Sequence, residues 1–246
     1  MVIPMPLMDE FKEERDEIKN RSFKERMSYF WDYYKWHVIG GVCGVFLVGS
    51  LLYTFLTNKE TAYYSAFINM AETIYSKDYK MDFAKLANID LDKSVLYFDS
   101  DMFLDFSAMD DATVQTTQKI MVHITAGDLD SMIGDLTAIN RYAYNDVLMD
   151  LRDFLTDEEL QKYENDFYYA DRALLEEAKE NPNLEYPADP TDPSSMKDPI
   201  PVAIRVNDCK KLSETYVYGE NQYFAVVINS KHQDLNHLFL NYIKEN

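Results

Sequence analysis

The chain has 246 residues, and 24 lysines and arginines against 43 aspartates and glutamates give it a formal net charge of −19. Phosphate backbones repel such an acidic chain, so the composition disfavours nucleic acid as a partner. A hydrophobic fraction of 47%, with 14% aromatic residues, excludes a disordered acidic chain. Only 7 residues are glycine, which leaves little material for a glycine-rich phosphate loop.

The first segment, residues 1–35, is predicted to contain an amphipathic helix. Its apolar residues Phe23, Met27, Phe30 and Tyr34 recur at helical spacing. Aromatic residues become dense at the end of the segment, which is typical of a membrane boundary. We expect a cytoplasmic juxtamembrane helix that anchors the following span. A docking helix for a cytoplasmic partner is the alternative.

An apolar run follows, with no charged residue between Val38 and Leu56. With its flanks, residues 36–57, it is long enough to cross a hydrocarbon layer of about 30 Å as one transmembrane helix. Positive residues are more frequent before the run than after it, so the N-terminus is predicted to be cytoplasmic. No small-x-small cleavage site follows, which favours an uncleaved signal anchor. Gly40 and Gly44 are spaced to let two spans approach, so a homodimer is an open alternative.

The negative charge lies almost wholly beyond the span. Residues 1–35 have a net charge of −1, whereas residues 58–246 hold 17 basic and 35 acidic residues, a net charge of −18. Such acidity keeps an exported domain soluble, or it attracts cationic partners. Cys209 is the single cysteine of this segment, so no intramolecular disulfide is expected there. The predicted location is a bacterial cell membrane, with one span and the C-terminal domain outside.

Strand and helix patterns alternate along residues 58–246, which predicts an extracytoplasmic α/β domain. Runs rich in β-branched and aromatic residues predict strands at 63–69, 94–98, 129–133, 167–170, 201–206 and 223–228. Helical periodicity predicts helices at about 79–87, 113–126, 136–144, 157–165, 171–180 and 232–244. Gly127 is the predicted stop of the second of these helices. The proline-rich stretch 181–200 is predicted to be a surface loop.

Residues Ala126–Asp135, with the sequence A-G-D-L-D-S-M-I-G-D, lie between two predicted helices. They resemble the A-G-[DE]-[IL]-D-x-x-I-G-D region of bacterial solute-binding proteins with the two-lobed periplasmic-binding fold. The closing strand and helix, with Phe239 and Tyr242, resemble the end of that family. With the aromatic segment before the span, the whole chain is similar to single-pass membrane proteins of clostridia. The resemblance implies a reduced solute-binding fold, because residues 58–246 are too few for two full lobes.

The same resemblance implies ligand contacts where strands end and helices begin, at Gly134, Asp135 and Thr137. Free backbone N–H groups at a helix start attract anions and polar ligands. Asp135 and Thr137 are also ordinary helix-capping residue types, so a structural role is the alternative.

The chain lacks the sequence motifs that mark common catalytic and metal-binding sites. The chain contains no H-E-x-x-H, C-x-x-C or G-x-S-x-G motif, so we expect no catalytic residue, metal site or cofactor. His232 and His237 are five positions apart, which places them on different faces of a helix as two surface histidines. Asp128 and Asp130 could act as an acid–base pair, although paired acids are common in so acidic a chain. The acidic run Asp99–Asp101 does not have calcium-loop spacing.

Three functions are therefore open. The favoured one is a non-enzymatic, membrane-anchored envelope protein that makes protein contacts through its exported α/β domain. The alternative is an extracytoplasmic solute-binding component serving a transporter or sensor, with a small solute as its ligand. The third is an envelope hydrolase, which requires a nucleophile and a base within hydrogen-bond reach.

Overall fold

The computed structural model describes residues 22–108, 110–181, 186–187, 189–219 and 221–244. The chain divides into two compact units, Met1–Asn58 and Lys59–Asn246, which are described separately. Expectations for residues 1–21 lie outside the described residues.

Residues 22–58, the described part of the first unit, contain one continuous helix, α2 (Phe23–Thr57). It begins after Ser22, whose backbone N–H donates a hydrogen bond of 3.0 Å to the Glu25 carboxylate. Its part Tyr34–Thr57 is long and apolar enough to cross a membrane, a property that signal sequences near an N-terminus share. Gly40 and Gly44 have open space where a Cβ would stand, and a homodimer through them stays a prediction.

The second unit, which we call the α/β unit, is built on a six-stranded sheet with the order β3-β1-β4-β8-β6-β5. Strands β3, β1 and β4 are parallel, whereas β8 is antiparallel to both β4 and β6, and β5 is antiparallel to β6. The strands are β1 (Glu60–Ile68), β3 (Ser94–Met102), β4 (Ser131–Gly134), β5 (Phe167–Asp171), β6 (Pro199–Arg205) and β8 (Tyr223–Val226).

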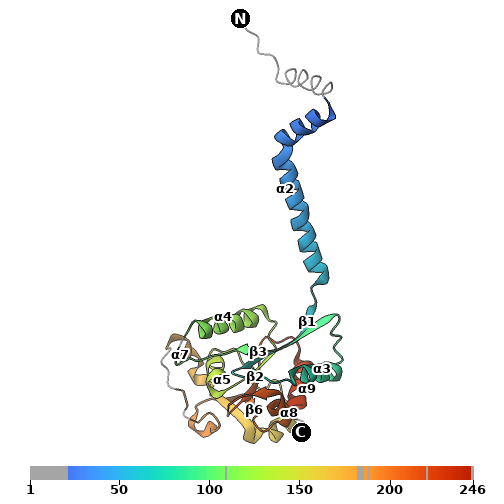
Figure 1. Ribbon diagram of the computed structural model, residues 1–246. Helices are drawn as coiled ribbons and strands as arrows, with labels where there is room; N and C mark the ends of the chain where they lie inside the picture. The colour runs from blue at the N-terminus through green and yellow to red at the C-terminus, as the bar shows by residue number, and fades with distance from the viewer. Residues whose placement is uncertain (1–21, 109, 182–185, 188, 220, 245–246) are drawn as a thin grey trace. The chain divides into compact units, whose positions relative to one another are not determined.

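Helices cover both faces of this sheet (Figure 1). Helices α4, α5 and α7 lie on one side of it, and α3, α8 and α9 lie on the other. The helices are α3 (Ser76–Leu86), α4 (Asp111–Ala126), α5 (Leu136–Ala143), α6 (Asp157–Lys162), α7 (Leu175–Glu180), α8 (Lys210–Thr215) and α9 (Gln233–Lys244). The predicted α/β class is therefore confirmed as a three-layer arrangement.

The alternation of side chains along β1 explains why both faces are covered. Tyr63 and Phe67 pack with Phe83 of α3 in one core cluster. The intervening Ala66 packs with Ile120 of α4 in the other cluster. Because successive strand residues point to opposite faces, a strand that is apolar at both sets of positions needs helices on each side.

Three short elements, two strands and helix α8, were not predicted from the sequence. Strands β2 (Ala71–Glu72) and β7 (Tyr216–Val217) form a separate antiparallel two-stranded ribbon. Helix α8 lies immediately before β7. In addition, the helix expected over 171–180 begins only at Leu175. The Asp171 carboxylate accepts the Ala173 N–H, and residues Arg172–Leu174 form a 3-10 turn before the helix.

All strands of the six-stranded sheet belong to the one compact α/β unit. The described residues therefore hold a single layered body and no second lobe comparable to it. The predicted resemblance to a solute-binding fold stays a prediction.

Candidate functional site

The predicted ligand residues Gly134, Asp135 and Thr137 lie together where β4 ends and α5 begins. Gly134 is buried, and a Cβ added there would stand 3.2 Å from the Ala138 Cβ and 3.3 Å from the Ile68 Cβ. Close packing between β1 and α5 therefore favours glycine at this position, since a larger residue would need its neighbours to shift by a few tenths of an ångström. Thr137 is exposed on the first turn of α5.

Asp135 has structural partners on two sides. Its carboxylate accepts the Ala138 N–H at 2.9 Å as a helix cap, and it accepts the Asn69 side-chain amide at 2.7 Å. Asn69 also exchanges two hydrogen bonds with the backbone of Leu104, at 2.8 and 3.0 Å. These contacts join the ends of β1 and β4 to the loop after β3. They support the structural role left open by the sequence, and a ligand contact at Gly134, Asp135 and Thr137 stays a prediction.

A second polar group is buried at the opposite end of β4. Asp130 is 1% exposed. Its carboxylate accepts hydrogen bonds from the Ser230 hydroxyl at 2.7 Å and the Tyr64 N–H at 3.0 Å, and it lies 3.0 Å from the His232 Nδ1. A buried carboxylate needs such partners, because it has lost its hydration.

The network extends from Asp130 to the C-terminal helix. The Asn236 amide donates to the Ser230 hydroxyl at 2.9 Å, and the Tyr63 hydroxyl donates to the Asn236 carbonyl oxygen at 2.8 Å. Burial raises the pKa of Tyr63 well above its usual value, so this hydroxyl stays a neutral donor. The network therefore connects α9 to β1 and β4, which is a structural role.

His232 and His237 are partly exposed, as the prediction of two surface histidines requires, and each also has a partner in the α/β unit. His232 is half-buried against Asp130, and the His237 ring stacks on Phe154 with a centroid separation of 3.9 Å. The reason is that both flank or belong to α9, which packs against the sheet.

Within the described segments, no group of three His, Cys, Asp or Glu residues could hold a metal ion. Nor does any hydroxyl or thiol described there hydrogen-bond to a histidine ring nitrogen.

Asp128 and Asp130, which the sequence offered as a possible acid–base pair, have different partners. Asp128 lies 3.0 Å from the Nδ1 of His123, whereas Asp130 belongs to the network of His232 and Ser230. Each carboxylate therefore has its own partners.

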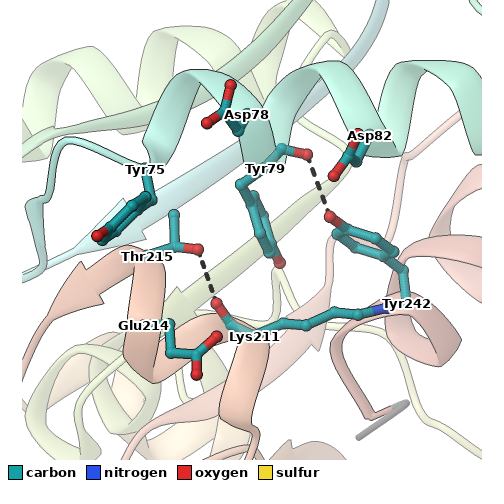
Figure 2. Close-up of a pocket in the computed structure, with 8 residues that line it drawn as sticks. All are labelled: Tyr75, Asp78, Tyr79, Asp82, Lys211, Glu214, Thr215 and Tyr242. Atoms are coloured by element: carbon teal, nitrogen blue, oxygen red, sulfur yellow. Dashed lines mark hydrogen bonds between the residues drawn. The ribbon is translucent and has the colours of Figure 1, made fainter.

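A hollow of about 630 Å³ opens between α3, α8 and α9 on the other side of the sheet from α4 (Figure 2). We call it the acidic hollow. Its polar lining consists of three carboxylates and one lysine, Asp78, Asp82, Glu214 and Lys211. Three tyrosines and one threonine complete it, Tyr75, Tyr79, Tyr242 and Thr215.

Helix α3 and its N-cap residue Tyr75 supply half of this lining because of their residue spacing. Asp78 and Asp82 are separated by four positions, so they lie one turn apart on the same side of the helix. Tyr75 and Tyr79 have the same spacing and form a neighbouring stripe. Figure 2 shows the two carboxylates on α3 above the tyrosine rings.

The lysine of the hollow rests on an aromatic ring. The Lys211 ammonium lies 4.4 Å from the centroid of the Tyr242 ring, a cation–π contact. No carboxylate in the described part of the chain lies within ion-pair distance of this ammonium. Burial, with the nearby charge of Asp82, raises the pKa of Tyr242 to about 12, so the ring under the ammonium stays neutral.

Two polar groups of the hollow have no partner within the described residues. The Asp78 carboxylate makes neither an ion pair nor a side-chain hydrogen bond there. Tyr79 is only 4% exposed, yet its hydroxyl has no hydrogen-bond partner. Figure 2 shows the Tyr79 ring projecting from α3 into the hollow, with its hydroxyl toward the Lys211 side chain. A buried hydroxyl without a hydrogen-bond partner lowers the stability of the folded state by about 1–3 kcal/mol. The hollow of the free protein therefore contains a polar group that lacks a hydrogen bond.

Exposed apolar side chains border the acidic hollow. Ile74 is 85% exposed, Tyr75 is 56% exposed and Val217 is 65% exposed. We call these three residues the apolar rim. They lie on the β2–β7 ribbon and on the turn that follows β2, which the Thr73 N–H fastens to the Thr215 carbonyl at 2.9 Å.

A second hollow of about 610 Å³ lies beside β2 and the edge strand β3. Its lining includes Glu72, Asp99, Asp101 and the half-exposed ring of Phe103. Burial raises the pKa of Asp99, but hydrogen bonds from Lys119 and the Tyr64 hydroxyl outweigh it and hold that pKa below its usual value. Carboxylates therefore line both hollows, and the second hollow also contains Lys80.

The sequence did not lead to the acidic hollow, although part of the signal was present. The predicted helix at 79–87 left out Tyr75 and Asp78, and neither α8 nor the ribbon was expected. The general clue was the net charge of −18 beyond the span.

Comparison with known proteins identifies no relative of this chain. No protein-family model, no curated protein and no solved structure matches it. The features of the chain that bear on its function are therefore α2, the apolar rim and the acidic hollow.

Proposed function

We propose that this protein is a non-enzymatic, membrane-anchored protein of the bacterial cell envelope whose α/β unit makes contacts with other proteins. Helix α2 would be the anchor, because its segment Tyr34–Thr57 has the length and composition of a span. The α/β unit would lie outside the cytoplasm, because positive residues are more frequent before the apolar run than after it. Lys19, Arg21, Lys24, Arg26 and Lys35 precede the run, whereas Lys59 and Lys77 follow it.

The apolar rim carries the proposal. Ile74, Tyr75 and Val217 expose most of their surface to water, whereas the same unit buries other large apolar side chains completely. Exposed apolar groups gathered beside polar ones are typical of protein interaction sites. Tyrosine in particular is enriched in the centres of interfaces.

Site-specific photo-cross-linking in intact cells tests this function. A photoreactive residue would replace Val217 in the full chain, and the matched control would replace Val122 of α4, which is equally exposed at 64% on the opposite side of the sheet. We expect covalent protein adducts at Val217 and none at Val122. Equal yields at both positions, or no adduct at either, would count against a specific contact surface.

The orientation is tested separately. Protease added to intact cells after removal of any outer layer should degrade the part of the chain beyond Asn58 and spare the segment before Tyr34. Digestion of the N-terminal segment instead would contradict the proposed topology.

An extracytoplasmic solute-binding component is the second candidate, and the volume of the acidic hollow favours it. A hollow of about 630 Å³ is within the usual size range of small-molecule sites. A ligand that binds the folded state raises its stability by RT ln(1 + [L]/Kd). Thermal unfolding of the full chain in detergent should therefore shift with one solute class, and no shift across sugars, amino acids, amines and anions would argue against this candidate.

A further inference from the structure

We propose that the acidic hollow receives a lysine or arginine side chain of a partner protein, while apolar residues of that partner cover the apolar rim. This inference rests on the proposed function, because it names the chemistry of the partner at the proposed contact surface.

The charge of the hollow selects a cation. Its lining holds three carboxylates, Asp78, Asp82 and Glu214, against the single ammonium of Lys211. Asp82 and Glu214 have exposed lysine neighbours one helical turn away, at 3.4 and 3.8 Å, and such surface pairs contribute little. Asp78 has no cationic partner among the residues described. An incoming cation would therefore gain attraction without breaking a strong ion pair.

The hollow already holds an ammonium group of its own. Lys211 lies 4.4 Å over the ring of Tyr242, and its stem passes below the Tyr79 hydroxyl in Figure 2. The intramolecular contact demonstrates that an ammonium fits against this aromatic wall. Because the Lys211 side chain is flexible, a second cation could displace it toward solvent.

The buried hydroxyl of Tyr79 is the second, independent indication of a ligand. A polar atom that is buried without a partner is rare in folded proteins, and a missing ligand is one explanation. Its oxygen can accept an N–H of a guanidinium or ammonium. Tyr75 and Tyr242 would flank the same group, as aromatic rings do in cation recognition.

The setting favours a protein side chain over a free solute. Small-molecule sites enclose most of their ligand and have mainly apolar walls. Here the carboxylates Asp78 and Asp82 are exposed at the mouth, and the apolar rim continues beyond it. A small solute would leave Ile74 and Val217 in water, whereas a partner with apolar residues beside its cation would cover them.

Peptide binding to the full chain in detergent tests the inference. The probe is a labelled peptide with one arginine between leucines, and its matched counterpart carries citrulline, which keeps the shape without the charge. Fluorescence anisotropy should show that the citrulline peptide binds at least about tenfold more weakly. Free arginine competes in a separate arm and should displace the peptide only at far higher concentration.

Variants locate the binding in the hollow. The double substitution Asp78→Asn with Glu214→Gln should weaken the arginine peptide by about tenfold. The control, Asp153→Asn with Glu164→Gln, changes the charge equally at exposed positions outside the hollow and should alter affinity by less than about twofold. Lys211→Met removes the internal cation and keeps the stem, so affinity should rise by about threefold. Near-UV circular dichroism of each variant checks that its fold is intact.

Each remaining outcome has a defined meaning. Equal binding of the arginine and citrulline peptides, or equal losses in both double variants, overturns the inference. If free arginine binds as tightly as the peptide, the ligand of the hollow is a small solute and not a side chain of a partner protein, and the inference is overturned. If cross-links form at Val217 while neither peptide binds, the contact function stands and this inference fails. If both experiments fail, the proposed function fails with it.

Discussion

At Gly134, strand β4 lies so close to β1 and α5 that an added side chain would need its neighbours to shift. A Cβ there would stand 3.2 Å from Ala138 and 3.3 Å from Ile68, and both neighbours are fixed within the core. We expect Gly134→Ala to lower the free energy of unfolding by about 1–3 kcal/mol through overpacking. The matched control is Gly219→Ala, because no atom lies within 4 Å of its added Cβ. Equal stability of the two variants, measured by urea unfolding of the full chain, would contradict the packing role.

Removing the Tyr79 hydroxyl should raise stability, unlike the Gly134 substitution. Because it is buried without a hydrogen-bond partner among the described residues, Tyr79→Phe removes a cost and keeps the ring packing. The free energy of unfolding should rise by about 1 kcal/mol. Tyr242→Phe is the control, since that hydroxyl donates a 3.2 Å hydrogen bond to the Tyr79 carbonyl and its loss should destabilise the protein slightly. A decrease in stability for Tyr79→Phe would mean that the hydroxyl has a partner in solution.

At the scale of elements, Asp171 fastens the segment before β6 to the end of β5. The residue is 4% exposed, and its carboxylate accepts N–H groups of Ala173, Lys197 and Asp198 at 3.0–3.1 Å. Burial raises its pKa, but these three hydrogen bonds outweigh burial, so the net pKa is lowered. A lowered pKa in the folded state means that the carboxylate stabilises the fold above its unfolded pKa of about 3.9 and loses this effect as the pH falls further.

Asp171→Asn should therefore cost about 1–3 kcal/mol at pH 7, because an amide can accept on only one of its two atoms. The difference from the unsubstituted protein should shrink as the pH falls below about 4. Asp192→Asn is the control, since its exposed carboxylate accepts one backbone N–H, from Ser194, that an amide oxygen can also accept. Urea unfolding at several pH values measures both. A cost that is unchanged down to low pH would show that charge is not involved.

The elements that the sequence predicted are those with strong local signals. Gly127 was expected to stop a helix, and it does so with a φ of 69°, a conformation that glycine adopts without strain. The strands predicted at 63–69 and 94–98 correspond to β1 and β3, because their apolar residues are dense. The bounds differ, since β1 runs from Glu60 to Ile68 and β3 extends to Met102. The parallel order of β3, β1 and β4 depends on distant pairing that no local pattern reveals.

The acidic hollow could not be predicted for a related reason. Helix α8 has six residues, and Cys209 at its N-cap makes no side-chain capping bond, so neither periodicity nor a cap marks it. The ribbon strands have two residues each and are defined by pairing across the fold. The hollow then joins Asp78, Lys211 and Tyr242, which only the tertiary structure brings together. Composition predicted the net charge of residues 58–246 but not where a charged hollow would form.

At the scale of the whole molecule, the α/β unit carries 17 basic and 35 acidic residues within one compact body. Like charges at this density repel one another and oppose the folded state. Raising the salt concentration from about 10 mM to about 150 mM shortens the screening length from about 30 Å to about 8 Å. We therefore expect the melting temperature of the α/β unit to rise by several degrees over this range.

Near-UV circular dichroism of the full chain in a neutral detergent measures this melting selectively. Both tryptophans, Trp31 and Trp36, lie in α2, whereas tyrosines such as Tyr63 and Tyr168 are fully buried in the α/β unit, so the tyrosine bands report on that unit. The variant Asp153→Asn with Glu164→Gln reduces the repulsion, so its melting temperature at low salt should be higher and its rise with salt smaller. A melting temperature that falls with salt would show instead that ion pairs such as Lys119–Asp99, at 2.7 Å, dominate over the net repulsion.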